Sequence, residues 1–272
     1  MLSKRIIGSL IVKDGIVVQS LGFARYLPVG SPEVAVEFLN QWGVDEIVVL
    51  DITASALGEP NYALVECLAK KVRVPLAYGG GIRSLEAMRR LIAGGADKLV
   101  LNTAAHENPS LLHEGAAVFG DQCIVVSIDV HEGEAREATE RAIAAHKMGA
   151  GEILLRTIER DGSKKGFDID VLKAVANAVH VPIIAAGGCG STTHTAEALA
   201  AGAVAVAIGN MLHFTEHSVV LIKQELKQAG VPVRLDTYAT YDGFEFDNGR
   251  VQKRDDEYLS KLRFEYHPPE II

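Results

Sequence analysis

The sequence lacks the features that mark exported, membrane-spanning and nucleic-acid-binding proteins. No apolar run approaches the roughly 18 residues that a membrane-spanning helix needs, and the first residues do not resemble a signal peptide. No basic cluster stands out in a chain of net charge −8, which argues against a nucleic-acid-binding face. The three cysteines, Cys67, Cys123 and Cys189, are odd in number and widely spaced, unlike a disulfide framework. We therefore expect a cytoplasmic protein with reduced thiols.

Signals for a metal or an organic cofactor are also missing. The nine histidines show no ligand spacing, and the glycine-rich turns do not follow the dinucleotide-binding fingerprint. We therefore predict neither a metal site nor a cofactor. Apolar residues are plentiful, at 48% of 272 residues, so the chain can bury a core the size of one large domain.

A stretch that occurs twice organises the chain. Residues 74–81 (VPLAYGGG) recur 107 positions later as residues 181–188 (VPIIAAGG), and the pair Gly95-Ala96 recurs at the same interval as Gly202-Ala203. Each copy has the order of strand, glycine turn, helix and strand. Because a constant interval over about thirty residues is rare by chance, we predict two duplicated halves.

The glycine turns of the two copies favour phosphate binding. A strand-turn-helix unit brings backbone N–H groups to the carboxyl ends of neighbouring parallel strands, where they can hold a phosphate. Each copy also ends in a second polar turn, Asn102-Thr103 in the first and Gly209-Asn210 in the second. Glycines permit tight turns without any ligand, but two copies in register favour two phosphates.

Residues 1–235 show the alternation of strands and helices that is typical of an α/β protein, here a (β/α)₈ TIM barrel of two duplicated half-barrels. Within it we expect a helix at residues 32–42, a strand at 46–51 and a helix at 59–71. Residues 16–30 contain two glycines, a proline and little periodicity. We expect them to form a long loop that moves over a site.

Residues 236–272 form a C-terminal extension of different composition. They hold seven of the fifteen Phe and Tyr residues, a density that argues against a disordered tail. The turn Asp247-Asn248-Gly249 predicts a hairpin, and residues 255–263 predict a short helix. We expect the extension to dock on the barrel or on a partner.

Four charged residues at strand beginnings predict a charged ring at one end of the barrel. Glu46 and Glu152 occupy matching positions of the two halves, while Arg5 and Lys98 begin two other strands. The amino ends of barrel strands usually concern stability rather than substrate. On residue types alone, a surface salt-bridge layer is therefore the favoured interpretation.

Asp129 is the candidate catalytic residue. It ends the predicted fifth strand, the usual place for a general acid or base in a barrel enzyme. Residues 6–12 align with residues 124–130, so the position that matches Asp129 in the first half is Ile11. A cap of a helix or turn is the alternative role for Asp129.

At these residues the chain resembles the cyclase subunit of imidazole glycerol phosphate synthase. The resemblance covers roughly residues 1–235 and rests on specific motifs. These are KRII at 4–7, VKDG at 12–15, LDITAS at 50–55, GGGI at 79–82, NTAA at 102–105, GEILL at 151–155, RDG at 160–162 and HF at 213–214.

The resemblance implies a function for each of these groups. In that family a class I glutaminase subunit docks on the amino-end face of the barrel, and its ammonia passes through the barrel to a substrate with two phosphates. By this resemblance Asp129 is a catalytic residue, and two further sets of residues acquire roles. The implied ammonia gate is Arg5, Glu46, Lys98 and Glu152, and the implied phosphate-binding residues are Gly81, Asn102, Thr103, Asp161, Gly162, Gly188, Gly209 and Asn210.

Two departures from the family pattern affect positions that the resemblance assigns to the catalytic end of the barrel. The family uses two aspartates for cyclisation, whereas this chain has Asp129 and, at the other position, Ile11. Gln19 stands where the first loop of the family carries a lysine. Isoleucine cannot transfer a proton, so ammonia transfer and phosphate binding look preserved while the standard ring closure does not.

Three functions follow from this pattern. The favoured one is a paralogue similar to the amidotransferase barrels of surface-polysaccharide biosynthesis, which deliver ammonia to amidinate a sugar with the help of a separate ATP-using enzyme. The second is a genuine histidine-biosynthesis cyclase, a lyase that makes imidazole glycerol phosphate. The third is a non-catalytic ammonia-channel scaffold.

Overall fold

A computed structural model describes residues 3–215, 217–235, 246–247 and 250–251. The chain divides into two compact units, Met1–Thr240 and Tyr241–Ile272. In the part of the chain that is described, no helix has the length and apolar character needed to cross a membrane.

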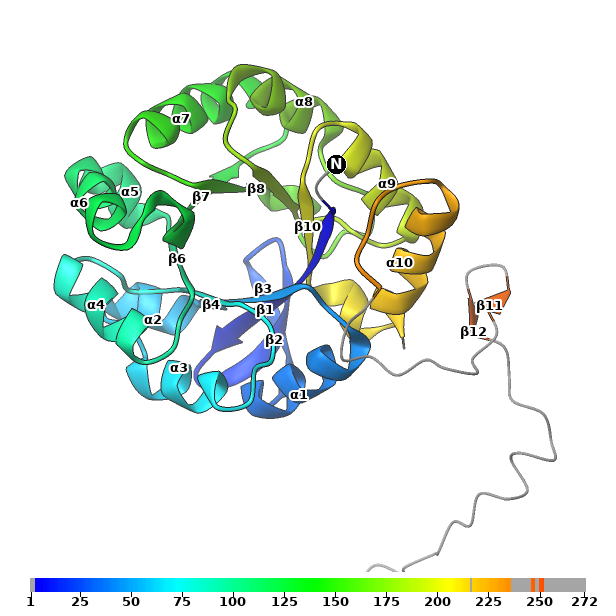
Figure 1. The fold of residues 1–272 in the computed structure, drawn as a ribbon, viewed down its shortest axis with the longest axis horizontal. Helices are drawn as coiled ribbons and strands as arrows, with labels where there is room; N and C mark the ends of the chain where they lie inside the picture. Colours follow the sequence, from blue (N-terminus) through cyan, green and yellow to red (C-terminus); the bar gives the residue numbers. More distant parts are fainter. Residues whose placement is uncertain (1–2, 216, 236–245, 248–249, 252–272) are drawn as a thin grey trace, which may run out of the picture. The chain divides into compact units, whose positions relative to one another are not determined.

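The first unit is a closed barrel of parallel strands surrounded by helices (Figure 1). Each barrel strand pairs with the next in parallel, and pairing of β10 with β1 closes the ring. This confirms the predicted (β/α)₈ TIM barrel. The barrel strands are β1 (Arg5–Lys13), β4 (Glu46–Asp51), β5 (Leu76–Gly79), β6 (Lys98–Leu101), β7 (Ile124–Val130), β8 (Glu152–Thr157), β9 (Ile183–Ala186) and β10 (Ala205–Ile208).

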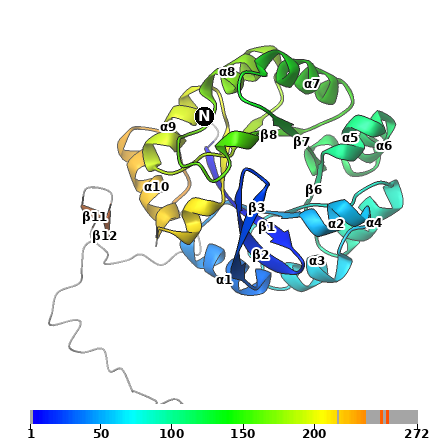
Figure 2. The same cartoon turned by 180° about the vertical axis from the view of Figure 1, so that it is seen from behind.

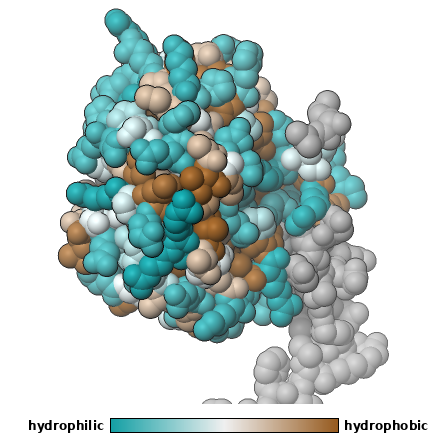
Figure 3. All heavy atoms as spheres, turned by 60° about the vertical axis from the view of Figure 1, so that its left-hand side comes forward, coloured by the Kyte–Doolittle hydropathy of each residue, from teal (hydrophilic) through white to brown (hydrophobic). Residues whose placement is uncertain are grey.

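Helices cover the outside of the strand ring. They are α1 (Pro32–Trp42), α2 (Ile52–Leu57), α3 (Tyr62–Ala69), α4 (Leu85–Ala93), α5 (Thr103–Glu107), α6 (Pro109–Phe119), α7 (Ala135–Lys147), α8 (Ile169–Ala178), α9 (Thr192–Ala200) and α10 (Ser218–Gln228), with the 3₁₀ turns η1 (Asp121–Cys123), η2 (Ile158–Arg160) and η3 (Asn210–His213). One face of this shell, in Figure 3, is mostly hydrophilic with apolar side chains gathered near its middle.

Local chemistry explains where the first helices begin and end. The Ser31 hydroxyl accepts a hydrogen bond from the Val34 N–H, and Gly43 ends α1 at φ 77°. The single helix expected at residues 59–71 is shorter, because α3 begins only after the Asn61 cap. The sequence interpretation missed α2, which the Asp51 side chain caps.

The pairing register repeats between the two halves. Ala77 faces Lys98 and Gly79 faces Val100 across β5 and β6. The pairs 107 positions later, Ile184 with Ala205 and Ala186 with Ala207, face each other across β9 and β10. The two copies of the repeated sequence therefore fold into equivalent units.

Residues 16–30 do not form the expected loop. They form the strands β2 (Ile16–Leu21) and β3 (Arg25–Gly30), an antiparallel hairpin that extends from β1 (Figure 2). The β-branched run at 16–18 supplies the strand, and Gly22 and Phe23 make the turn with positive φ. Apolar and polar residues do not alternate strictly along this segment, so the sequence pattern did not predict the hairpin.

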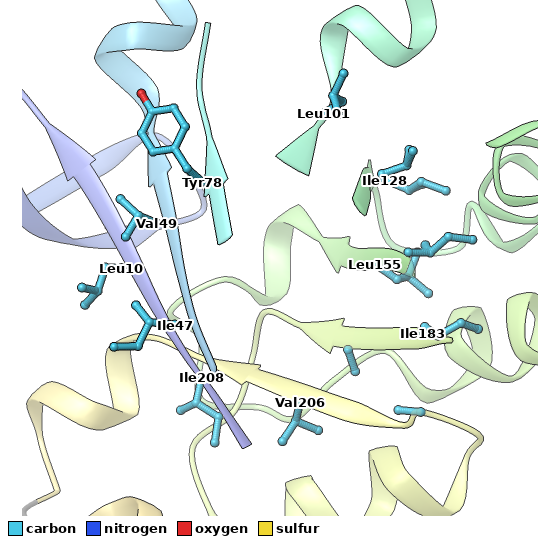
Figure 4. Packing of buried hydrophobic residues seen from close by; sticks show 14 of the residues in the cluster. Leu10, Ile47, Val49, Tyr78, Leu101, Ile128, Leu155, Ile183, Val206 and Ile208 are labelled. Carbon is cyan, nitrogen blue, oxygen red and sulfur yellow. The ribbon is translucent and has the colours of Figure 1, made fainter. Parts of the chain in front are cut away.

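Apolar side chains alternate between two cores along the barrel strands. Residues such as Leu10, Ile47 and Tyr78 point outward and pack between the sheet and the helices (Figure 4). Their neighbours, such as Ile7, Val48 and Ala77, point into the barrel and form a separate inner cluster. The barrel is therefore filled with apolar side chains.

In the second unit, β11 (Phe246–Asp247) pairs antiparallel with β12 (Arg250–Val251). The expected helix at residues 255–263 lies outside the described residues. The boundary at residue 235 and the docking of the extension remain predictions.

A buried ion pair joins α10 to the amino end of the barrel. Lys223 donates from Nζ to Asp45 Oδ1 over 2.7 Å and to the Gly43 carbonyl over 2.7 Å. The other carboxylate oxygen of Asp45 accepts the Ile6 N–H over 2.8 Å. Both charged side chains are buried, and Arg234 Nε lies 3.7 Å from Asp45 Oδ1, so Lys223 is the nearer counter-ion of this carboxylate.

We expect Lys223→Met to lower the free energy of unfolding by about 3 kcal/mol, because it leaves the Asp45 carboxylate buried without its main counter-ion. Urea denaturation measures this loss. Lys227→Met, at an exposed position of the same helix, is the control and should change stability by less than about 0.5 kcal/mol. Equal stability of the two variants would contradict this account of the ion pair.

Candidate active site

The four residues predicted at strand beginnings meet in a ring of ion pairs. Arg5 Nη1 lies 2.8 Å from Glu46 Oε2, and Lys98 Nζ lies 2.8 Å from the same oxygen. Arg5 Nη2 and Lys98 Nζ also contact Glu152, the latter over 2.7 Å. Burial raises the pKa of the Glu46 carboxyl, although Lys98 opposes this shift. Each carboxylate is thus shared by two cations at the amino end of the barrel.

The space next to this ring is small and apolar. A cavity of about 10 Å³ is lined by Glu46 of the ring and by the inner side chains, including Ile7, Val48, Ala77 and Leu154. A volume of this size holds roughly one water-sized molecule. The ring therefore lies directly against the apolar interior of the barrel.

The first glycine turn opens on the larger cavity at the carboxyl ends of the strands. This cavity, of about 190 Å³, is lined by Gly81, Asn102, Thr103 and Asp129, among others. A Cβ atom at Gly81 would lie 2.4 Å from the backbone carbon of Glu59, and the φ of Gly81 is +70°. Only glycine fits this close turn.

The second glycine turn lies in a much smaller space of about 30 Å³. Its lining contains all the residues predicted for this end, which are Asp161, Gly162, Gly188, Gly209 and Asn210. The hairpin covers this end: Asn210 Nδ2 donates to the Ser20 carbonyl over 2.6 Å, and the Gly22 N–H donates to the Asp161 carbonyl over 3.1 Å. The two glycine turns are therefore equivalent in sequence but not in the accessible space beside them.

Asp129 projects among side chains of three neighbouring strands. Its carboxylate accepts from Asn102 Nδ2 over 2.6 Å and from Ser127 Oγ over 3.3 Å. Arg156 Nη1 lies 3.5 Å from Asp129 Oδ1. Asn102 thus couples the predicted phosphate turn to the predicted catalytic residue.

Ile11, the counterpart of Asp129, lies in the lining of the smaller cavity and is buried. It faces Leu50 across β1 and β4, whereas Asp129 faces Arg156 across β7 and β8. One wall of the barrel mouth is therefore apolar where the matching wall carries an ion pair. Gln19 lies on β2, opposite Leu27.

One residue of the site, Arg156, was not predicted from the sequence, and it lines both cavities. Asp51, which the sequence places at the carboxyl end of the second barrel strand, lines the larger cavity and caps α2. The available signal for Arg156 was a charged residue directly after the apolar run of β8. Among the described residues no group of three or more His, Cys, Asp or Glu side chains is arranged to hold a metal ion.

Comparison with known proteins matches residues 5–218 to the family model described as histidine biosynthesis protein. The chain belongs to this family. A Vibrio vulnificus protein provisionally named imidazole glycerol phosphate synthase subunit hisF2 is 39% identical over 263 residues, which cover 91% of this chain and 97% of the relative. The imidazole glycerol phosphate synthase subunit HisF of Caulobacter vibrioides is 42% identical over 256 residues, covering 87% and 98%.

This member of the histidine biosynthesis family is thus a HisF-like cyclase-type subunit, as the sequence motifs predicted. The roles of its individual residues rest on the geometry described above and remain predictions.

We expect Gly81→Ala to lower the free energy of unfolding by about 3 kcal/mol or more, since it combines left-handed strain with overlap against the Glu59 backbone. Gly133→Ala is the matched control, because Gly133 also has positive φ (84°) but no atom within 4 Å of the place that a Cβ would take. The control should lose only about 1 kcal/mol, the cost of the backbone conformation. Urea denaturation of both variants checks the difference, and equal losses would refute the overlap.

Proposed function

We propose that this chain is the ammonia-receiving barrel subunit of a glutamine-dependent complex, with a phosphorylated acceptor bound at the carboxyl ends of its strands. A glutaminase subunit docks on the amino-end face. The acceptor differs from the two-phosphate aminoimidazole precursor, and ammonia delivery to a surface-sugar acceptor, aided by an ATP-using enzyme, is the favoured reaction. The observation that carries the proposal is the ion-pair ring beneath an apolar barrel interior.

The ring supports a controlled entrance for a small neutral molecule. Arg5, Glu46, Lys98 and Glu152 neutralise one another, so the entrance has no excess charge to hold an ion. The adjoining cavity has room for about one molecule of the size of water or ammonia, and its walls are otherwise apolar. An uncharged amine crosses such an interior at far lower cost than an ammonium ion.

The acceptor end supports binding of a phosphorylated substrate. Gly80 and Gly81 form the first turn with positive φ and line the larger cavity, and Asn102 and Thr103 line the same cavity. Asp129 lies against Asn102, within reach of a group held there. A carboxylate so placed can accept a proton from the nitrogen that ammonia contributes.

The apolar wall at Ile11 argues against the standard ring closure. Cyclisation with two aspartates needs a carboxyl group on each side of the substrate, and removal of one general acid or base typically costs about 10²–10⁴-fold in rate. Here the side opposite Asp129 carries Ile11 and Leu50. This supports a reaction other than the standard ring closure, on a substrate still held by the two glycine turns.

A genuine cyclase is the second candidate function, and the position of Asp161 favours it. The carboxyl group of Asp161 lies in the same cavity as Ile11, and burial raises its pKa. A raised pKa keeps a proton available at higher pH, as a general acid requires. Asp161 is then the substitute proton donor.

We expect Lys98→Met to separate glutamine hydrolysis from product formation in the complex with the cognate glutaminase, because Glu46 and Glu152 lose one of the two cations that they share and keep only Arg5. A loss of about 1.4 kcal/mol in coupling lowers the yield of product per glutamine roughly tenfold. Lys147→Met, on the exposed end of α7, should leave the ratio unchanged. Unchanged coupling in folded Lys98→Met would remove the entrance role of the ring.

We expect the unmodified chain to release little imidazole glycerol phosphate when it is combined with a histidine-pathway glutaminase and the two-phosphate aminoimidazole precursor. Ile11→Asp should raise the rate by roughly 10²-fold, since it restores the second carboxyl group. The variant Ile11→Asn introduces a side chain of the same shape as aspartate but without an acidic group, so it should not raise the rate. Rapid turnover by the unmodified chain, abolished by Asp161→Asn, would instead establish the genuine cyclase.

A further inference from the structure

We propose that Arg156 binds a carboxylate group of the substrate, so that the acceptor carries a carboxylate in addition to its phosphate. This inference deepens the proposed function and rests on it. Arg156 is one position before the end of β8, at the barrel mouth, and is only 4% exposed. It lines both cavities and is therefore placed between the two glycine turns.

The guanidinium of Arg156 has unused hydrogen-bonding capacity. Arginine has five N–H donors, and burying them without acceptors is costly. Within the described part of the chain, Arg156 has an ion-pair contact of 3.5 Å with Asp129 and a ring contact with Phe23, but no side-chain hydrogen bond. The distance to Asp129 is longer than the roughly 2.7–2.9 Å of a charge-assisted hydrogen bond. Donors remain free for a ligand in the cavities.

The barrel fold does not require a cation at this position. The duplicated halves place Leu50 at the position that corresponds to Arg156, with Ile11 beside it in place of Asp129. A leucine thus occupies the equivalent strand position in the other half, and the strand forms there without a cation. Arg156 is best explained by a ligand rather than by the stability of the strand.

Asp129, the acid in contact with Arg156, does not depend on the guanidinium alone. It already accepts hydrogen bonds from Asn102 and Ser127. Asp161 lines the smaller cavity together with Arg156, and burial raises the pKa of its carboxyl group, although the charge of Arg156 opposes this shift. A further anion can therefore approach Arg156 from the larger cavity without leaving Asp129 unpaired.

The position of Phe23 favours a planar anion. The Phe23 ring centre lies 4.7 Å from Arg156 Cζ, and this aromatic contact restricts how the guanidinium can turn. A carboxylate matches the guanidinium fork with two parallel hydrogen bonds. The glycine turns supply backbone N–H groups for phosphate, so the two anions of the substrate are recognised by different groups.

Two pairs of probes that differ only in a carboxylate test this assignment. One pair is 3-phosphoglycerate and glycerol 3-phosphate, and the longer pair is 6-phosphogluconate and sorbitol 6-phosphate. Isothermal titration of the full chain should show that at least one carboxylate probe binds roughly tenfold or more tightly than its partner, the size expected for hydrogen bonds to a charged group. Inorganic phosphate measures binding to the glycine turn alone.

Arg156→Gln and Arg156→Leu should abolish this preference and leave binding of the carboxylate-free probes unchanged, while Arg156→Lys should retain part of it. Arg141→Gln is the matched control, because Arg141 donates to the Asp129 carbonyl from outside the mouth cavities. Arg156→Leu, which copies Leu50, should keep the wild-type Tm. A purely structural role would instead lower its Tm and leave the preference intact.

Equal binding of both members of each pair by the wild-type chain, or a preference that survives in Arg156→Gln, would overturn the inference while phosphate binding stands. Failure of every phosphorylated probe and of inorganic phosphate to bind would overturn the phosphate-binding part of the proposed function, and the carboxylate inference with it. The two failures are therefore distinguishable.

Discussion

The parallel hydrogen bonds between β1 and β10 close the sheet, and the positions of all the site residues depend on this closure. Once the ring is closed, the amino ends of the strands meet at one mouth and the carboxyl ends at the other. Arg5, Glu46, Lys98 and Glu152 come from four different strands and could not share two carboxylates in an open sheet. The same closure brings the two glycine turns to the opposite mouth.

Most of the fold was predictable, because the helix-capping residues and the repeated stretch both indicate the barrel. Proline after Ser31 and glycine at 43 define α1, and the repeated glycines define both half-barrels. The hairpin β2–β3 was not predictable, because its stability comes from pairing with β1 and from contacts of Ser20 and Gly22 with the barrel. Such tertiary pairing overrides weak local preference.

The site was predictable where the two halves match and unpredictable where they differ. Gly81, Asn102 and Thr103 were found because glycine and polar turns stand at fixed positions of the repeat. Arg156 was missed because its counterpart is Leu50, so the repeat offered no second example. The unequal volumes of the two cavities depend on the hairpin and on side-chain directions, neither of which spacing reveals.

The repeated register has a consequence for inheritance. Each glycine turn, with the strands beside it, is a module whose pairing is settled within its own half, as the matching contacts of β5–β6 and β9–β10 illustrate. Mutations at Ile11 or Leu50 alter one wall of the mouth without disturbing the hydrogen bonds that hold the other module. A gene for such a barrel can therefore accumulate substitutions in one half while the other half keeps its strand pairs.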